Sequence, residues 1–166
     1  MTLAADLSYR WNDPADIGPA AAFAGRIIGA APQYISHGEI QTGLSDDGQT
    51  WVPDLADLYA KDFADPGERD MLVGRDDAGD VRAILIVAWE ENPRRRYAVI
   101  EDMAVDPELR SHGVGKEMLL QAEARIRKRG VEWVFLESGR ENEGAHGFFE
   151  REGFEKLSSV FGRKLG

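Results

Sequence analysis

The chain has 166 residues, of which 43% are hydrophobic and 30% charged, and this balance is typical of one soluble domain spanning residues 1–166. No apolar run approaches the roughly 20 residues that span a bilayer. The N-terminus lacks a basic region followed by an apolar core, so we expect a cytoplasmic protein without a secretory signal and without membrane contact. The net charge of −10 disfavours nucleic acid, and the lack of cysteine excludes disulfides, thiolate metal sites and a cysteine nucleophile.

The first part of the chain predicts one strand followed by two helices. Residues 7–11 have the pattern of a short strand, and residues 13–32 that of a helix. Residues 33–51 are rich in Gly, Asp and Ser and predict a loop. In residues 52–67, Leu55, Leu58, Tyr59 and Phe63 recur at helical spacing before Pro66 and Gly67 end the helix.

The second part changes to strands. Residues 70–76, 81–91 and 97–105 predict a β-meander, antiparallel because its connections are short. An amphipathic helix over 115–130, a strand over 131–138, a short helix over 142–153 and a final strand or broken strand pair over 154–165 follow. The order β-α-α-β-β-β-α-β-α-β predicts an α/β (α+β) fold, with a mixed, mostly antiparallel central sheet flanked by helices.

The stretch "RSHGVGK", residues 110–116, lies between the third meander strand and the amphipathic helix. The first N–H groups of a helix have no intrahelical partner and attract anions, and glycines let a phosphate approach the backbone. Arg110 adds a bidentate donor. The alternative is that Gly113 and Gly115 only form the turn. The spacing matches neither a P-loop nor a dinucleotide-binding fingerprint.

Two motifs together resemble the GNAT acetyltransferase superfamily. The pattern [RQ]-x-x-G-x-[GA] is filled by Arg110, Gly113 and Gly115. Downstream, "NEGAHGFFEREGF" matches a second family signature at Asn142, Ala145, Phe149, Gly153 and Phe154. The resemblance covers about Val81 to Phe154 and implies the GNAT fold, with acetyl-CoA as co-substrate. The N-terminal third fits by element order alone.

The resemblance also implies roles for individual residues. The backbone of Met103, Ala104 and Val105 would pair with the pantetheine arm as an added strand. The pyrophosphate would be held by the N–H groups of Arg110, Ser111, His112, Gly113, Val114, Gly115 and Lys116. The strand over 131–138 would diverge from that over 97–105 and leave a slot for the thioester. Asn142 would bind the pantetheine or acetyl region, or serve as a helix N-cap.

The catalytic candidates are Glu101 and Asp102, on the strand beside the thioester. An alkylamine has a pKa of roughly 10.4, so a base helps to deprotonate it. The "IEDM" pattern resembles polyamine and glucosamine-phosphate acetyltransferases, in which the Glu is commonly the base or amine anchor. From this resemblance we place Glu101 first and Asp102 second. Adjacent strand residues face opposite sides, so only one of the two can easily reach the acceptor. The alternative is a structural salt bridge with one of Arg94–Arg96.

Phe149 departs from the family pattern. Many members carry Tyr there, and its hydroxyl acts as an acid toward the sulfur, which Phe cannot do. Tyr97, Ser138 and His146 are conceivable replacements. Phe149 would still pack against the cofactor, or else serve as a core aromatic. The three histidines have no metal-ligand spacing, so we expect no metal site.

We therefore expect an acetyl-CoA-dependent N-acetyltransferase acting by direct attack in a ternary complex. The acceptor would be the primary amine of a small molecule or peptide, and a cationic one is favoured by the charge. The acidic residues of the variable region and of the strand end are Asp46, Asp47, Asp54, Asp57, Asp62, Asp65, Glu90 and Glu91. The alternative is a non-catalytic acyl-CoA-binding or regulatory module, and a third is O-acetyl or longer-acyl transfer. An exposed edge near the C-terminus predicts a homodimer.

Overall fold

The computed structural model describes residues 6–166 and divides into two compact units. The first contains the chain up to Ala30 together with Asp54–Glu137. The second contains Ala31–Pro53 and Ser138–Gly166. The single domain over 1–166 and the homodimer stay predictions. Across the described residues no helix is long and apolar enough to cross a membrane, and no group of three or more His, Cys, Asp or Glu could hold a metal ion.

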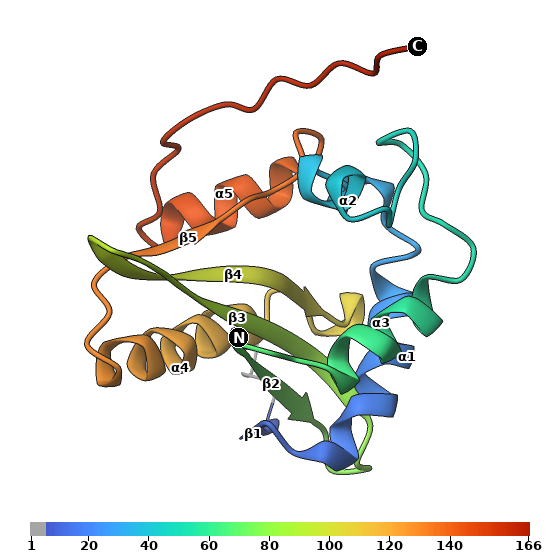
Figure 1. Ribbon diagram of the computed structural model, residues 1–166. Helices are drawn as coiled ribbons and strands as arrows, with labels where there is room; N and C mark the ends of the chain where they lie inside the picture. The colour runs from blue at the N-terminus through green and yellow to red at the C-terminus, as the bar shows by residue number, and fades with distance from the viewer. Residues whose placement is uncertain (1–5) are drawn as a thin grey trace. The chain divides into compact units, whose positions relative to one another are not determined.

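The first unit is built on a five-stranded sheet in the order β1-β2-β3-β4-β5 (Figure 1). The strands are β1 (Ser8–Trp11), β2 (Arg69–Arg75), β3 (Val81–Asn92), β4 (Arg95–Val105) and β5 (Val134–Leu136). All neighbours are antiparallel except β4 and β5, which are parallel. The predicted mixed, mostly antiparallel sheet flanked by helices is confirmed.

Helices cover both faces of this sheet. Helices α1 (Ile17–Ile27) and α3 (Leu55–Ala64) lie on one side, and α4 (Val114–Lys128) lies on the other (Figure 1). A Cβ on Gly25 would come within 2.6 Å of the Ala56 Cβ, so a glycine is required where α1 crosses α3. Short 3-10 turns, η1 (Pro14–Asp16) and η3 (Pro107–Leu109), precede α1 and α4.

A buried carboxylate ties β1 and β2 to the start of α1. Asp16 is fully buried and accepts hydrogen bonds from the guanidinium groups of Arg10 and Arg75. The hydrogen bonds from Arg10, and then those from Arg75, hold the pKa of Asp16 below its usual value although burial opposes them. The pairing satisfies a charge that would be costly to bury alone.

The second unit departs from the sequence prediction in two places. Residues 33–51 were expected to be loop, but they include η2 (Pro32–Tyr34) and α2 (His37–Gln41), which begins at a Ser36–Glu39 capping box. After α5 (Glu143–Arg151), the expected strand within 154–165 is wrong, because residues 154–166 take no regular structure. An extended segment becomes a strand only when a partner satisfies its backbone groups, and no pairing of this segment with another described residue is found.

Candidate coenzyme and active site

The loop before α4 has the backbone of an anion site. Ser111 and Gly113 both have positive φ, +66° and +80°, and the helix begins at Val114, one residue before the predicted start. Alternation into the left-handed region turns successive N–H groups toward one side of a loop. Among the described residues, no acceptor is found for the N–H groups of Ser111, Gly113, Val114, Gly115 and Lys116. These five amides, together with the positive end of the α4 dipole, form a concave donor surface.

Two amides of the predicted set are already used. The N–H of Arg110 donates to Pro107 O at 3.3 Å, and that of His112 donates to Leu109 O at 3.3 Å. The His112 ring also binds Arg110 O at 2.8 Å. Arg110 is exposed and forms no ion pair with any described residue, so its side chain, not its amide, is available to an anion.

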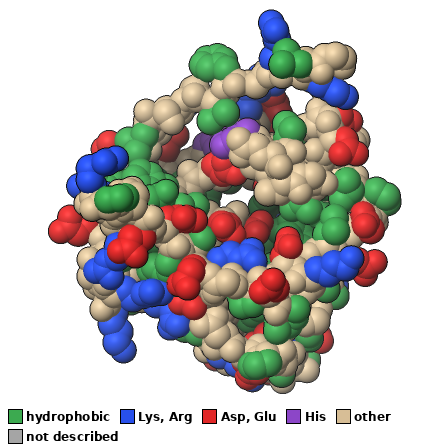
Figure 2. Space-filling model, in the orientation of Figure 1, with side chains coloured by type: hydrophobic (Ala, Val, Ile, Leu, Met, Phe, Trp, Pro, Cys, Tyr) green, Lys and Arg blue, Asp and Glu red, His purple; other side chains and the backbone are tan. Residues whose placement is uncertain are grey.

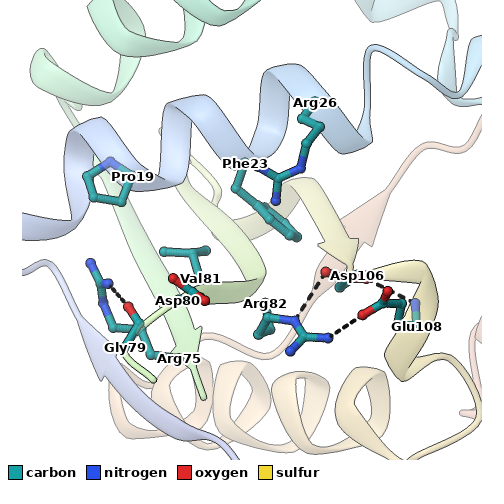
Figure 3. Close-up of a pocket in the computed structure, with 10 residues that line it drawn as sticks. All are labelled: Pro19, Phe23, Arg26, Arg75, Gly79, Asp80, Val81, Arg82, Asp106 and Glu108. Atoms are coloured by element: carbon teal, nitrogen blue, oxygen red, sulfur yellow. Dashed lines mark hydrogen bonds and ion pairs between the residues drawn. The ribbon is translucent and has the colours of Figure 1, made fainter. Parts of the chain in front are cut away.

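Arg82 fastens the turn that leads into this loop. Its guanidinium contacts Asp106 at 3.1 Å and Glu108 at 3.2 Å, and a third bond reaches Asp76 at 2.9 Å. Figure 3 shows the contacts of Arg82 with Asp106, the N-cap residue of η3, and with Glu108, in the wall of a cavity of about 590 Å³. Asp106 also accepts from the Glu108 amide, which closes η3. No local pattern in the sequence indicated this role of Arg82.

Beside the loop, β4 extends beyond its parallel neighbour. The β4–β5 pairing covers three positions and ends at Ile100 and Leu136. Beyond that point Glu101 is skipped by the register, and Asp102–Val105 pair with β3. A strand edge of this kind can accept another extended chain. The family resemblance predicts that the two strands diverge here, and Met103–Val105 lie on the part of β4 beyond the last β4–β5 pair. The coenzyme role of these residues stays a prediction.

Glu101 lies where the two strands separate. Its Oε2 is 3.6 Å from Nη1 of Arg69, and its side chain is 37% exposed. Burial raises the pKa of Glu101, the charge of Arg69 opposes this, and Glu90 and Asp62 raise it further. The ion-pair partner is thus Arg69 on β2, and not Arg94, Arg95 or Arg96. Thirty-two positions separate the two residues in the chain, so only the sheet brings them together.

A bulge changes the expected orientation of Asp102. Ile86 of β3 lies opposite Asp102, whereas the next residue, Val87, lies opposite Ile100, so Glu101 is an extra residue in β4. The register places Asp102 on the same face as Ile86. Arg69 lies opposite Ala88, two residues after Ile86, so Arg69 is on this face as well. The ion pair with Arg69 brings the Glu101 side chain to the same face. The expectation that the two carboxylates face opposite sides is wrong, because the bulge interrupts the alternation.

Asn142 and Phe149 belong to the second unit. Asn142 occupies the N-cap position of α5, but its side chain makes no capping bond, so the simple N-cap alternative lacks its hydrogen bond. Phe149 is partly exposed and packs against Phe148 and Phe154, with ring centroids 5.2 and 5.7 Å apart. His146 binds Gly139 O at 2.9 Å. The contacts of Asn142 and Phe149 with the coenzyme stay predictions.

The acidic residues of the variable region have different roles. Asp47 accepts bonds from the Gln49 and Thr50 amides, which lower its pKa to about 2 and commit it to its own loop. Asp62 and Glu90, by contrast, act electrostatically on Glu101. Figure 2 shows acidic side chains spread over the viewed face and interspersed with basic ones. The excess of acidic residues is thus spread over the viewed surface, and of these residues Asp62 and Glu90 act on Glu101.

Comparisons with known proteins identify the family. The model of the acetyltransferase (GNAT) family matches residues 6–154. An uncharacterised N-acetyltransferase of Methanocaldococcus jannaschii is 39% identical over 75 residues, which are 45% of this chain and 33% of the relative. The mycothiol acetyltransferase of Propionibacterium freudenreichii is 29% identical over 115 residues, or 69% of this chain and 36% of the relative. The chain therefore matches about a third of the length of these relatives.

Solved structures share the fold at low sequence identity. An aminoglycoside 6′-N-acetyltransferase from Acinetobacter baumannii superimposes with a TM-score of 0.70 at 15% identity, covering 97% of this chain and 100% of the other. A predicted acetyltransferase from Clostridium acetobutylicum, solved with acetyl-CoA, gives 0.67 at 15% identity, covering 96% and 97%. Acetyl-CoA is the acetyl donor of the matched family. With a family model that matches nearly the whole chain, the protein belongs to the acetyltransferase (GNAT) family.

Proposed function

We propose that this protein is an acetyl-CoA-dependent N-acetyltransferase that acts on the primary amine of a small acceptor. The observation that carries the proposal is a juxtaposition within the first unit. Five unpaired amides at the start of α4 lie at the end of β4, and the part of β4 that extends beyond β5 runs back from there to Glu101. A coenzyme held by its pyrophosphate at the loop would lay its extended arm along that edge.

The residues of this chain would divide the work as follows. The amides of Ser111 and 113–116, with the Arg110 guanidinium, bind the pyrophosphate. The backbone of Met103–Val105 pairs with the pantetheine arm. Asn142 and Phe149, on α5 of the second unit, are further coenzyme contacts that the family resemblance implies. Acetyl-CoA supplies the activated acetyl group as a thioester.

Glu101 is the proposed base, with Asp102 as the second carboxylate on the same face. An acceptor arrives as an ammonium ion and must lose a proton before its nitrogen can attack. A carboxylate whose pKa is raised by burial is a stronger base than an ordinary glutamate. The nitrogen then forms a bond to the carbonyl carbon and loses its second proton to solvent, the carbon–sulfur bond breaks, and the thiolate takes up a proton from solvent. No hydroxyl is available at Phe149 to supply that proton.

Phe149 also favours the second candidate, a non-catalytic acyl-CoA-binding module. A core role for this ring is consistent with its contacts with Phe148 and Phe154. Release of free thiol from acetyl-CoA across a panel of amines separates the two functions. Binding of CoA by calorimetry without turnover of any amine would select the module.

Glu101→Gln tests the catalytic assignment. The variant should lower kcat by roughly 100-fold, the lower range for loss of a general base, while the Kd for CoA stays unchanged. Glu91→Gln is the matched control, because Glu91 is an exposed glutamate near the end of β3. Equal kcat for wild type and Glu101→Gln at neutral pH would remove Glu101 as the base.

A further inference from the structure

Resting on the N-acetyltransferase function proposed above, we infer that a second cavity, next to Glu101, is the acceptor pocket and takes a primary amine with an apolar body. This cavity has a volume of about 360 Å³ and lies between the start of α1, the end of α3 and β2. Its size suits a small molecule or one side chain of a peptide. It is distinct from the cavity that Arg82, Asp106 and Glu108 line.

The lining of the cavity is largely apolar. Ile17 and Phe63 contribute from the two helices, and Met71 and Ile86 contribute from the sheet. Apolar walls contribute binding energy to a hydrocarbon body and none to a hydroxylated one. This composition favours an alkyl or aryl amine over a sugar amine.

The sheet register brings the cavity to the proposed base. Met71 lies opposite Ile86 in the β2–β3 pairing, and Ile86 lies opposite Asp102 in the β3–β4 pairing. The cavity floor is therefore one strand spacing, about 4.8 Å, from the residue that follows Glu101. An acceptor body in the cavity would place its amine at the bulge in β4.

Arg69 joins the cavity wall to Glu101. Its guanidinium donates to Pro66 O at 2.7 Å, and to Asp62 O and Asp65 O at 3.1 Å each, so it binds the end of α3. Its remaining contact is the 3.6 Å ion pair with Glu101. Arg69 thus fixes the wall and the carboxylate relative to each other.

The charges around this junction favour a cation. Asp62 lines the cavity and forms no ion pair with a described residue, and Glu90 acts on Glu101 from β3. Two further carboxylates, Asp62 and Glu90, therefore act on Glu101 against the single guanidinium of Arg69, at the place where the amine would enter. An ammonium group is the ligand charge that compensates this excess.

A homologous series of amines tests the inference by binding, independently of turnover. We would titrate n-alkylamines from ethylamine to hexylamine into the protein with CoA present and measure Kd by calorimetry. Each added methylene should tighten binding about fourfold, the equivalent of burying one CH₂. Ala64→Trp, which adds an indole to the cavity wall, should flatten the series.

The matched control is Ala78→Trp, the same replacement in an exposed turn outside the cavity, which should keep the slope. Affinity that is independent of chain length in the wild type, or a slope lost equally in both variants, would overturn the pocket assignment. Failure of the proposed function has a different signature: the slope is retained, but no amine releases thiol from acetyl-CoA.

Discussion

The phosphate-binding role proposed for the coenzyme loop, residues 110–116, is tested most sharply by replacing Gly113 with two residues of the same shape, Asn and Asp. This residue has a φ of +80°, and no atom lies within 4 Å of the position that a Cβ would take. Asn and Asp tolerate the left-handed region better than other residues with side chains. Gly113→Asn and Gly113→Asp should therefore disturb the backbone equally and differ only by one negative charge.

The size of the charge effect follows from the geometry of the loop. At about 4 Å, two like unit charges repel by about 1 kcal/mol in water and about 4 kcal/mol at the effective dielectric constant near a protein surface. Because Gly113 is exposed, we take about 1–2 kcal/mol for each of the two charges of a pyrophosphate. Gly113→Asp should then bind CoA roughly 30- to 1,000-fold more weakly than Gly113→Asn.

Calorimetric titration of CoA at several salt concentrations provides the measurement. The ratio of the two Kd values should shrink as the Debye length falls from about 10 Å at 0.1 M to about 3 Å at 1 M salt. Gly79 is the control site, since it has a φ of +84° and equal free space in the β2–β3 turn. There the Asn and Asp variants should bind CoA equally. Equal affinities for the two Gly113 variants would refute the phosphate role of this loop.

Three further perturbations test the site and its supports. Arg69→Gln removes the cation that opposes the raised pKa of Glu101, so the acidic limb of the kcat/KM profile should move to higher pH, with Arg69→Lys in between. Asp16→Asn should cost about 3 kcal/mol of unfolding free energy in urea titrations, as loss of a buried pairing does. The pKa of Asp16 is lower in the folded than in the unfolded protein, so the stability that its ionised form contributes is fully present above the unfolded-state pKa. That stability is lost as the pH falls through the folded-state pKa, and the Asp16→Asn variant should lack this loss. Arg82→Met releases η3 and should raise the Kd for CoA at least tenfold with kcat at saturation retained; an unchanged Kd would show that the turn holds without it.

Much of the fold was predictable because many of its elements are specified by residues close together in the sequence. Apolar residues at helical spacing marked α3 and α4, and short turns marked the antiparallel strands β2, β3 and β4. The helix α2 was missed although Ser36 and Glu39 form a capping-box signature in the sequence. The final strand was wrong, because strand formation depends on a partner that local sequence does not specify.

The sequence by itself determined the position of the loop proposed to bind the coenzyme, residues 110–116, since Arg110, Gly113 and Gly115 lie within six consecutive positions and their chemistry is that of one helix start. The tertiary structure alone decided the surroundings of Glu101. One extra residue in β4 reverses the alternation of side chains, and Arg69 of β2 reaches Glu101 of β4 across the strand between them, β3. Contacts between distant segments depend on register and packing, and a shift of one residue in register exchanges the faces of a strand.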